Sequence, residues 1–186
     1  MPNLRAPFAV VVDRSGAVLP TVGQDAPIRL DLAELNWLAV LAGSDPIEGV
    51  PTPLHTLAPL VAELAGREQS GSVAQLPEAP KSGALNPSID PASPYIIVNP
   101  VAFRLSSGGF ELVDHHGLVS CRLDAREFAA ALSFVSPRVT VDAFEEQAMR
   151  LGNWAFVLGD FEALTARLIA AGIVIRLDDD RANLAE

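Results

Sequence analysis

One order of residue types occurs twice in the chain, and it limits what the chain can fold into. The first copy reads FAVVVDRSGAV and, after an insertion, IRLDLAELNWLAVLAG; the second reads FELVDHHGLV and then CRLDAREFAAALSFVS. Each copy has an apolar strand, Val-Asp-x-x-Gly, a second apolar strand, and Arg-Leu-Asp-x-x-Glu before an apolar helical stripe. An aspartate followed by glutamate three residues later is typical of the capping box that opens a helix. The sequence therefore predicts two related units, in each of which a hairpin leads into a helix.

The segment between the two copies has a different character. Proline, glycine and serine recur throughout 67–94, and no apolar periodicity persists there. Such a segment buries too little apolar surface to offset its ordering entropy. We interpret 1–66 as a truncated lobe, 67–94 as a linker, 95–178 as a complete lobe and 179–186 as an acidic tail. The truncated lobe lacks a counterpart of the middle helix, and its last helix is predicted over 56–66.

The complete lobe continues from its hairpin into three predicted helices. Asp124 opens the first helix, Thr140 is expected to cap the second, and the third extends from near Asp160 to Gly172. A short closing strand is predicted over 173–175. Strands followed by three helices are the order of a winged helix. We therefore expect an α+β, winged-helix-like fold in tandem with a shortened N-terminal copy.

Charge and composition exclude several classes of partner. The 186 residues carry a net charge of −10, with 13 Lys and Arg against 23 Asp and Glu, and Lys81 is the single lysine. Nucleic-acid binding requires clustered cations, so neither nucleic acid nor an anionic membrane is expected as a partner. The lone Cys121 allows no internal disulfide, which favours a cytoplasmic location. We interpret Cys121 as a small buried hydrophobe rather than a nucleophile, because nothing in the sequence supplies its base.

The histidine pair of the second copy has two interpretations. Asp114, His115 and His116, followed by a glycine, align with residues 13–16 of the first copy, where only the aspartate and the glycine recur. Those two residue types serve the backbone of a tight turn, because aspartate accepts amide hydrogen bonds and glycine tolerates positive φ. We therefore interpret the histidines as residues of an exposed hairpin tip and expect no cofactor or catalytic residue. A metal site built on Asp114, His115 and His116 is the alternative.

The second lobe resembles a known family of binding domains. The resemblance covers about 103–177 and rests on the stretches FRLSSGGFELVDHHGLVSCRLDAREFAAALSFV, VTVDAFEEQAM and GDFEALTARLIAAGIV. These are similar to the precursor-recognition domains of ribosomally made, post-translationally modified peptide biosynthesis, whose archetype is the peptide chaperone of pyrroloquinoline quinone biosynthesis. In that family the leader region of a precursor peptide docks as an added strand beside the third helix, which is β-augmentation.

The resemblance also implies which residues bind the peptide. The edge strand would consist of Leu118, Val119, Ser120, Cys121 and Arg122, and the facing helix wall of Leu164, Arg167 and Leu168. Leu164 and Leu168 have an alternative role as core residues, because an apolar helical stripe usually packs inward. The two arginines are the better candidates for contact with an acidic leader.

The resulting hypothesis is a non-catalytic peptide-binding module that presents a precursor peptide to a peptide-modifying enzyme. A homodimer is compatible with this hypothesis. The alternatives are a winged-helix transcriptional regulator and a small metal-dependent enzyme that uses the Asp-His-His turn. The charge of the predicted third helix, one arginine against two acids in DFEALTARLIAA, disfavours the regulator.

Overall fold

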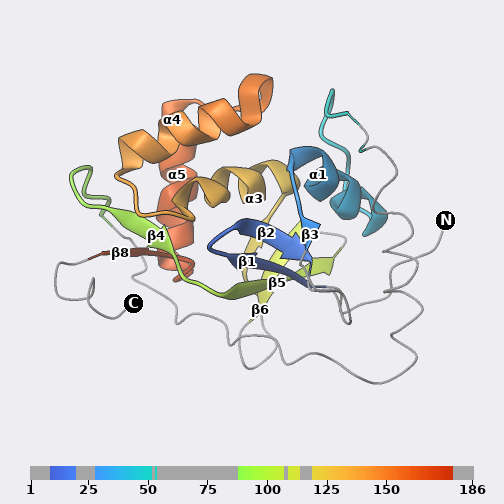
Figure 1. Ribbon diagram of the computed structural model, residues 1–186, viewed down its shortest axis with the longest axis horizontal. Helices are drawn as coiled ribbons and strands as arrows, with labels where there is room; N and C mark the ends of the chain where they lie inside the picture. The colour runs from blue at the N-terminus through green and yellow to red at the C-terminus, as the bar shows by residue number, and fades with distance from the viewer. Residues whose placement is uncertain are drawn as a thin grey trace.

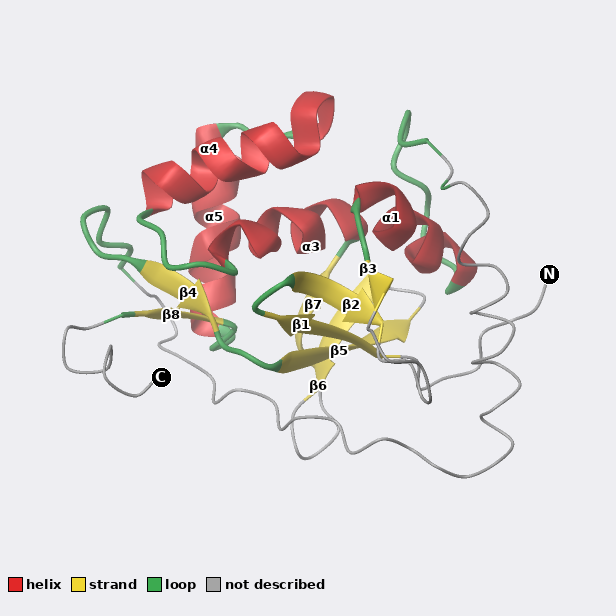
Figure 2. Ribbon diagram, viewed as in Figure 1, coloured by secondary structure: helices red, strands yellow, loops and turns green. Residues whose placement is uncertain are grey.

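The fold belongs to the α+β class that the sequence predicts (Figure 2). The computed structural model describes residues 9–19, 28–51, 53, 88–106, 109–113 and 119–177. These residues form one large and one small antiparallel sheet, with helices packed beside them. The helix predicted over 56–66, most of the linker and the acidic tail lie outside the described residues.

The large sheet contains strands from both sequence copies. In spatial order its six strands are β3 (Ile28–Arg29), β2 (Gly16–Leu19), β1 (Ala9–Asp13), β5 (Val101–Ser106), β6 (Gly109–Val113) and β7 (Val119–Leu123). β1 and β5 connect the copies, with Val10 opposite Phe103. The two predicted lobes therefore share one sheet. A separate small sheet pairs β4 (Tyr95–Ile97) with β8 (Val174–Arg176).

Helices α1 (Leu32–Leu41) and α3 (Ala125–Ala131) pack on one face of the large sheet (Figure 1). Helices α4 (Thr140–Leu151) and α5 (Leu158–Ala170) pack against α3, and α5 also contacts β8 of the small sheet. Helix α3 is central, because it contacts α1, α4 and α5 as well as β6 and β7. The order β5, β6, β7, α3, α4, α5 is the predicted order of strands followed by three helices. β8 then follows α5. It is the closing strand predicted over 173–175, and it begins one residue later than predicted.

Both predicted capping boxes are present. In α1 the Asp31 carboxylate accepts a hydrogen bond from the Glu34 amide at 2.9 Å, and the Glu34 side chain accepts one from the Asp31 amide at 2.8 Å. In α3 Asp124 and Glu127 form the same pair of hydrogen bonds, at 2.7 and 3.0 Å. Each cap satisfies amides that have no partner within the helix and stabilises it by about 1 kcal/mol. The repeated Asp-x-x-Glu motif therefore begins both helices.

The expected turn chemistry is also present in the first copy. The Asp13 carboxylate accepts a hydrogen bond from the Ser15 amide at 2.6 Å, and Gly16 has a φ of +120°. Gly172, with a φ of +72°, follows the last residues of α5 as the predicted left-handed cap. The corresponding turn of the second copy, with its two histidines, lies outside the described residues.

The prediction that Thr140 caps the second helix is wrong. The extended residue before α4 is Val139, with φ −70° and ψ 158°, and Thr140 is the first helical residue. The Thr140 hydroxyl is buried and has no hydrogen-bond partner in the described part of the chain. Pattern alone does not separate the two positions, because the β-branched Val139 adopts the extended conformation as readily as threonine does.

The hydrophobic core extends from the large sheet and α1 across α3 to α4, α5 and the small sheet, and three phenylalanine rings pack between the large sheet and α3. Phe128 of α3 stacks on Phe110 of β6, with ring centroids 4.4 Å apart, and meets Phe103 of β5 edge-on at 4.9 Å. All three rings are fully buried, and each contributes about 1.5–3 kcal/mol through burial of apolar surface. Because side chains alternate along a strand, residues next to Phe103 and Phe110 lie on the opposite face of the sheet.

Candidate functional site

β7 is the outermost strand at one end of the large sheet. It pairs with β6 on one side, and within the described residues no strand pairs with its other side. Cys121 and Leu123 are buried toward the helices, whereas Val119, Ser120 and Arg122 are exposed. An unpaired strand offers a row of backbone amides and carbonyls to an additional strand. The open border of β7, meaning the unpaired side of Val119–Leu123, is therefore the first candidate for binding.

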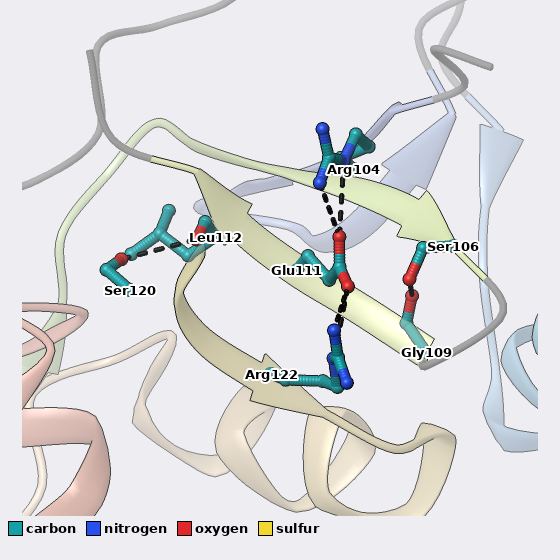
Figure 3. Close-up of polar contacts among 7 residues, drawn as sticks. All are labelled: Arg104, Ser106, Gly109, Glu111, Leu112, Ser120 and Arg122. Carbon is teal, nitrogen blue, oxygen red and sulfur yellow. Dashed lines mark hydrogen bonds and ion pairs between the residues drawn. The ribbon is translucent and has the colours of Figure 1, made fainter. Parts of the chain in front are cut away.

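A β-bulge modifies the start of this border. Leu112 is opposite Cys121 and Val113 is opposite Val119, so Ser120 is the extra residue on β7. The Ser120 hydroxyl donates a hydrogen bond to the Leu112 carbonyl oxygen at 3.3 Å (Figure 3). Bulges of this kind bend an edge strand and limit indiscriminate pairing with other chains. The regular part of the border is consequently Cys121–Leu123.

Three charged residues cross the face of the sheet that points away from α3. Arg104 of β5 is directly opposite Glu111 of β6, and Glu111 is directly opposite Arg122 of β7. Arg104 donates to Glu111 Oε2 from Nε at 3.2 Å and from Nη2 at 2.6 Å (Figure 3). Arg122 donates to Glu111 Oε1 from Nε at 3.0 Å and from Nη2 at 2.6 Å. We call these three residues the charge ladder.

The carboxylate at the centre of the charge ladder is buried and ionised. The Glu111 side chain is 4% exposed, against 37% for Arg104 and 56% for Arg122. Burial raises the pKa of Glu111, but the hydrogen bonds from Arg104, Ser106 and Arg122 together outweigh this effect and lower it below its ordinary value. The single carboxylate of Glu111 thus forms ion pairs with two guanidinium groups, and the charge ladder has a net charge of +1.

The helix side of β7 carries a different group of residues. Arg167 of α5 forms an ion pair with Glu127 of α3 at 2.7 Å, and its positive charge acts to lower the pKa of the Cys121 thiol. Burial raises the pKa of the Cys121 thiol, and the nearby Arg167 does not reverse this shift. The thiol is therefore protonated at neutral pH, which does not suit a nucleophile.

The residues singled out from the sequence occupy three kinds of position. Val119, Ser120 and Arg122 are exposed on the open border, and Arg167 is 48% exposed on α5 beside Cys121. Leu164 and Leu168 belong to the hydrophobic core, at 4% and 0% exposure, which is the alternative role considered for them. The remaining candidates lie outside the described residues: Leu118, Asp114, His115 and His116.

Sequence reasoning missed Arg104 and Glu111. A signal for both exists, because each of three successive strands has one charged residue between apolar ones: Phe-Arg-Leu in β5, Phe-Glu-Leu in β6 and Cys-Arg-Leu in β7. In a half-buried strand a central charge points to the face opposite the core. Three such strands in succession, with signs plus, minus and plus, predict cross-strand ion pairs when the register aligns them.

Within the described part of the chain, no group of three or more His, Cys, Asp or Glu side chains is placed to hold a metal ion. This does not test the Asp-His-His hypothesis, since that turn is not among the described residues. No helix in the described ranges is long and apolar enough to span a lipid bilayer.

Comparisons of the chain with family models, with curated proteins and with solved structures found no match.

Proposed function

We propose that this protein captures the leader region of a precursor peptide as an added strand on the open border of β7. It is a non-catalytic module that presents the bound peptide to a peptide-modifying enzyme. The observation that supports the proposal best is the terminal position of β7 in the sheet, with Val119, Ser120 and Arg122 exposed. We expect the activity in the cytoplasm, where ribosomal peptides are made and where an unpaired cysteine is stable.

The chemistry of the border favours an extended peptide over other ligands. Backbone hydrogen bonds to an added strand supply affinity without regard to sequence, and side chains that alternate between the two faces supply selectivity. One face of the new strand would be next to Arg122 and the charge ladder. The other face would be next to Arg167 of α5, which is half-exposed and close to Cys121.

The charges of α5 count against nucleic acid as the ligand. Asp160 is in the first turn of α5, where an acidic side chain faces any phosphate that approaches the helix N-terminus. Its Arg167 is already paired with Glu127. Together with the net charge of −10, this arrangement lacks the cationic surface that phosphate binding requires.

The proposal is tested by a peptide selection followed by a backbone scan. Displayed random peptides, and peptides encoded by short open reading frames beside the gene, are selected on the immobilised protein. Each amide of a recovered peptide is then methylated in turn, and affinity is measured by fluorescence anisotropy. Because alternate amides of an added strand face the sheet, N-methylation should weaken binding at every second position only.

A variant of the border provides the second readout. Val119→Pro removes an amide and restricts the backbone at the start of β7, so peptide affinity should fall while circular dichroism shows a folded protein. The matched control is Val141→Pro, because Val141 is also exposed and lies in the first turn of α4, where proline is tolerated. Recovery of no binding peptide, or N-methylation effects without the two-residue period, would contradict the proposal.

A further inference from the structure

The charge ladder is incomplete at its outer end. Its three residues alternate in sign across adjacent strands, and the last one, Arg122, is on the strand with the open border. At the inner end, β1 places Ala9 opposite Arg104, so the alternation stops there at a small apolar residue. A strand added to β7 would supply the next position of the ladder, directly across from Arg122.

Arg122 has donors available for a further acceptor. Its Nε and Nη2 bind Glu111 Oε1 at 3.0 and 2.6 Å, which is the side-on edge of the guanidinium. Its third nitrogen, Nη1, contacts no acceptor within the part of the chain that the structure describes. The side chain is 56% exposed. The planar guanidinium therefore offers its end-on edge, which matches a carboxylate geometrically.

Strand geometry determines which peptide residue reaches this edge. An added strand lies about 4.8 Å from β7, and the residue directly opposite Arg122 points to the same face of the sheet. The neighbouring peptide residues point to the helix side, where Arg167 is paired with Glu127. A carboxylate opposite Arg122 would neutralise the net charge of the ladder, whereas one shifted by a single residue would not reach it.

We propose that the peptide bound by this protein carries an aspartate or glutamate at the position paired with Arg122. This inference rests on the proposed function and names the sequence class of its ligand. The preference is positional and not a general attraction for acidic peptides, because the chain as a whole has a net charge of −10 and repels them at long range. A second copy of this chain is the less suitable occupant, because the bulge at Ser120 and the exposed Arg122 both oppose self-pairing of the border.

The experiment compares the peptides selected by the wild-type protein with those selected by Arg122→Gln. A library of displayed random peptides is the probe, and Arg150→Gln is the matched control, because Arg150 is an exposed arginine of α4, 38% exposed, with an ion pair to Glu146. We expect one acidic position among wild-type and control peptides, and none with Arg122→Gln. Replacing that residue by glutamine should weaken binding roughly three- to five-fold, as for an exposed cross-strand charge pair, and lysine more strongly.

A double-mutant cycle and a shifted peptide make the result specific. Glutamine in the peptide should cost nothing further when the protein is Arg122→Gln, and Arg122→Lys should restore part of the preference. Moving the acidic residue by one position at constant composition should remove its benefit. Melting temperatures of all variants verify that they fold. The altered peptides are also measured against the wild-type protein, so the positional preference is tested without any substitution in the protein.

The outcomes separate the two proposals. Peptides that show the two-residue N-methylation period but no acidic position, or an acidic preference that survives in Arg122→Gln, would overturn this inference and leave the proposed function intact. Absence of peptide binding would overturn both. Sedimentation that reveals a dimer disrupted by Val119→Pro would assign the open border to a second copy, and it would likewise overturn the inference.

Discussion

Glu111→Gln tests the electrostatic description of the sheet most directly. The substitution keeps the size of the side chain but removes the one negative charge that two guanidinium groups share. The glutamine side chain has only one oxygen, so its NH₂ group must face either Arg104 or Arg122. Both the NH₂ group and the guanidinium are hydrogen-bond donors, so no hydrogen bond can form between them. Two arginines then lie on adjacent strands without their counter-charge.

The expected cost follows from burial of the three side chains. Breaking a fully buried ion pair by removal of one partner costs about 3–5 kcal/mol. Here the Glu111 side chain is 4% exposed but the arginines are 37% and 56% exposed, so water can solvate the guanidinium groups after the substitution. We therefore expect the free energy of unfolding to fall by about 2 kcal/mol, below the fully buried range.

The pH dependence gives an independent check on the same residue. The pKa of Glu111 is lowered from 4.5 in the folded protein, so its ionised form is favoured by folding. Its contribution is fully present above the pKa of the unfolded state and is lost as the pH falls through the lower folded value. The stability difference between wild type and Glu111→Gln should therefore be constant near neutrality and shrink as the pH decreases below about 4.5.

Urea denaturation followed by circular dichroism measures both effects. Glu145→Gln is the control, because Glu145 is an exposed glutamate on α4 and its replacement should change stability by less than about 0.5 kcal/mol. A loss at neutral pH no larger than that of the control would refute the ion-pair argument. So would a loss that persists unchanged in acid, since a charge effect must disappear when the carboxylate is protonated.

Three further substitutions test the packing that supports the open border. Gly109→Ala should lower the free energy of unfolding by about 3 kcal/mol or more in urea titrations, because the φ of Gly109 is +104° and a Cβ there would lie 2.4 Å from the Leu123 carbonyl oxygen. The control is Gly159→Ala, which should be neutral or slightly stabilising because the space around Gly159 is open. Arg126→Ala should lower the free energy of unfolding by about 2 kcal/mol and increase amide exchange in the segment before α5. The Arg126 guanidinium donates hydrogen bonds to the carbonyl oxygens of Trp154 and Ala155, at 2.5 and 2.9 Å, and stacks on the ring of Phe156. Asp124→Ala should lower the free energy of unfolding by about 1 kcal/mol, and Asp124→Asn by less, because asparagine can still cap α3. Equal losses for the two variants would contradict the capping role.

Features that depend on a few consecutive residues could be predicted from the sequence. The two capping boxes, the Asp13–Gly16 turn, the glycine that ends α5 and the order of strands and helices all follow from local hydrogen bonding and backbone conformation. The misplaced cap at Thr140 marks the limit of this reasoning, since adjacent residues with similar preferences differ by one position in the structure.

Features that join distant segments were decided by the tertiary structure. The pairing of β1 with β5 places both sequence copies in one sheet, and the terminal position of β7 follows from which strands pair, not from the composition of β7 itself. The sequence contains Arg104, Glu111 and Arg122, but only the register of three strands brings them together. A shift of one residue would turn Glu111 toward the core, because side chains alternate with a period of two. The sequence by itself thus determined the order of the elements and the two capping boxes, because these depend on neighbouring residues, while long-range pairing decided which border stays open and which charges meet there.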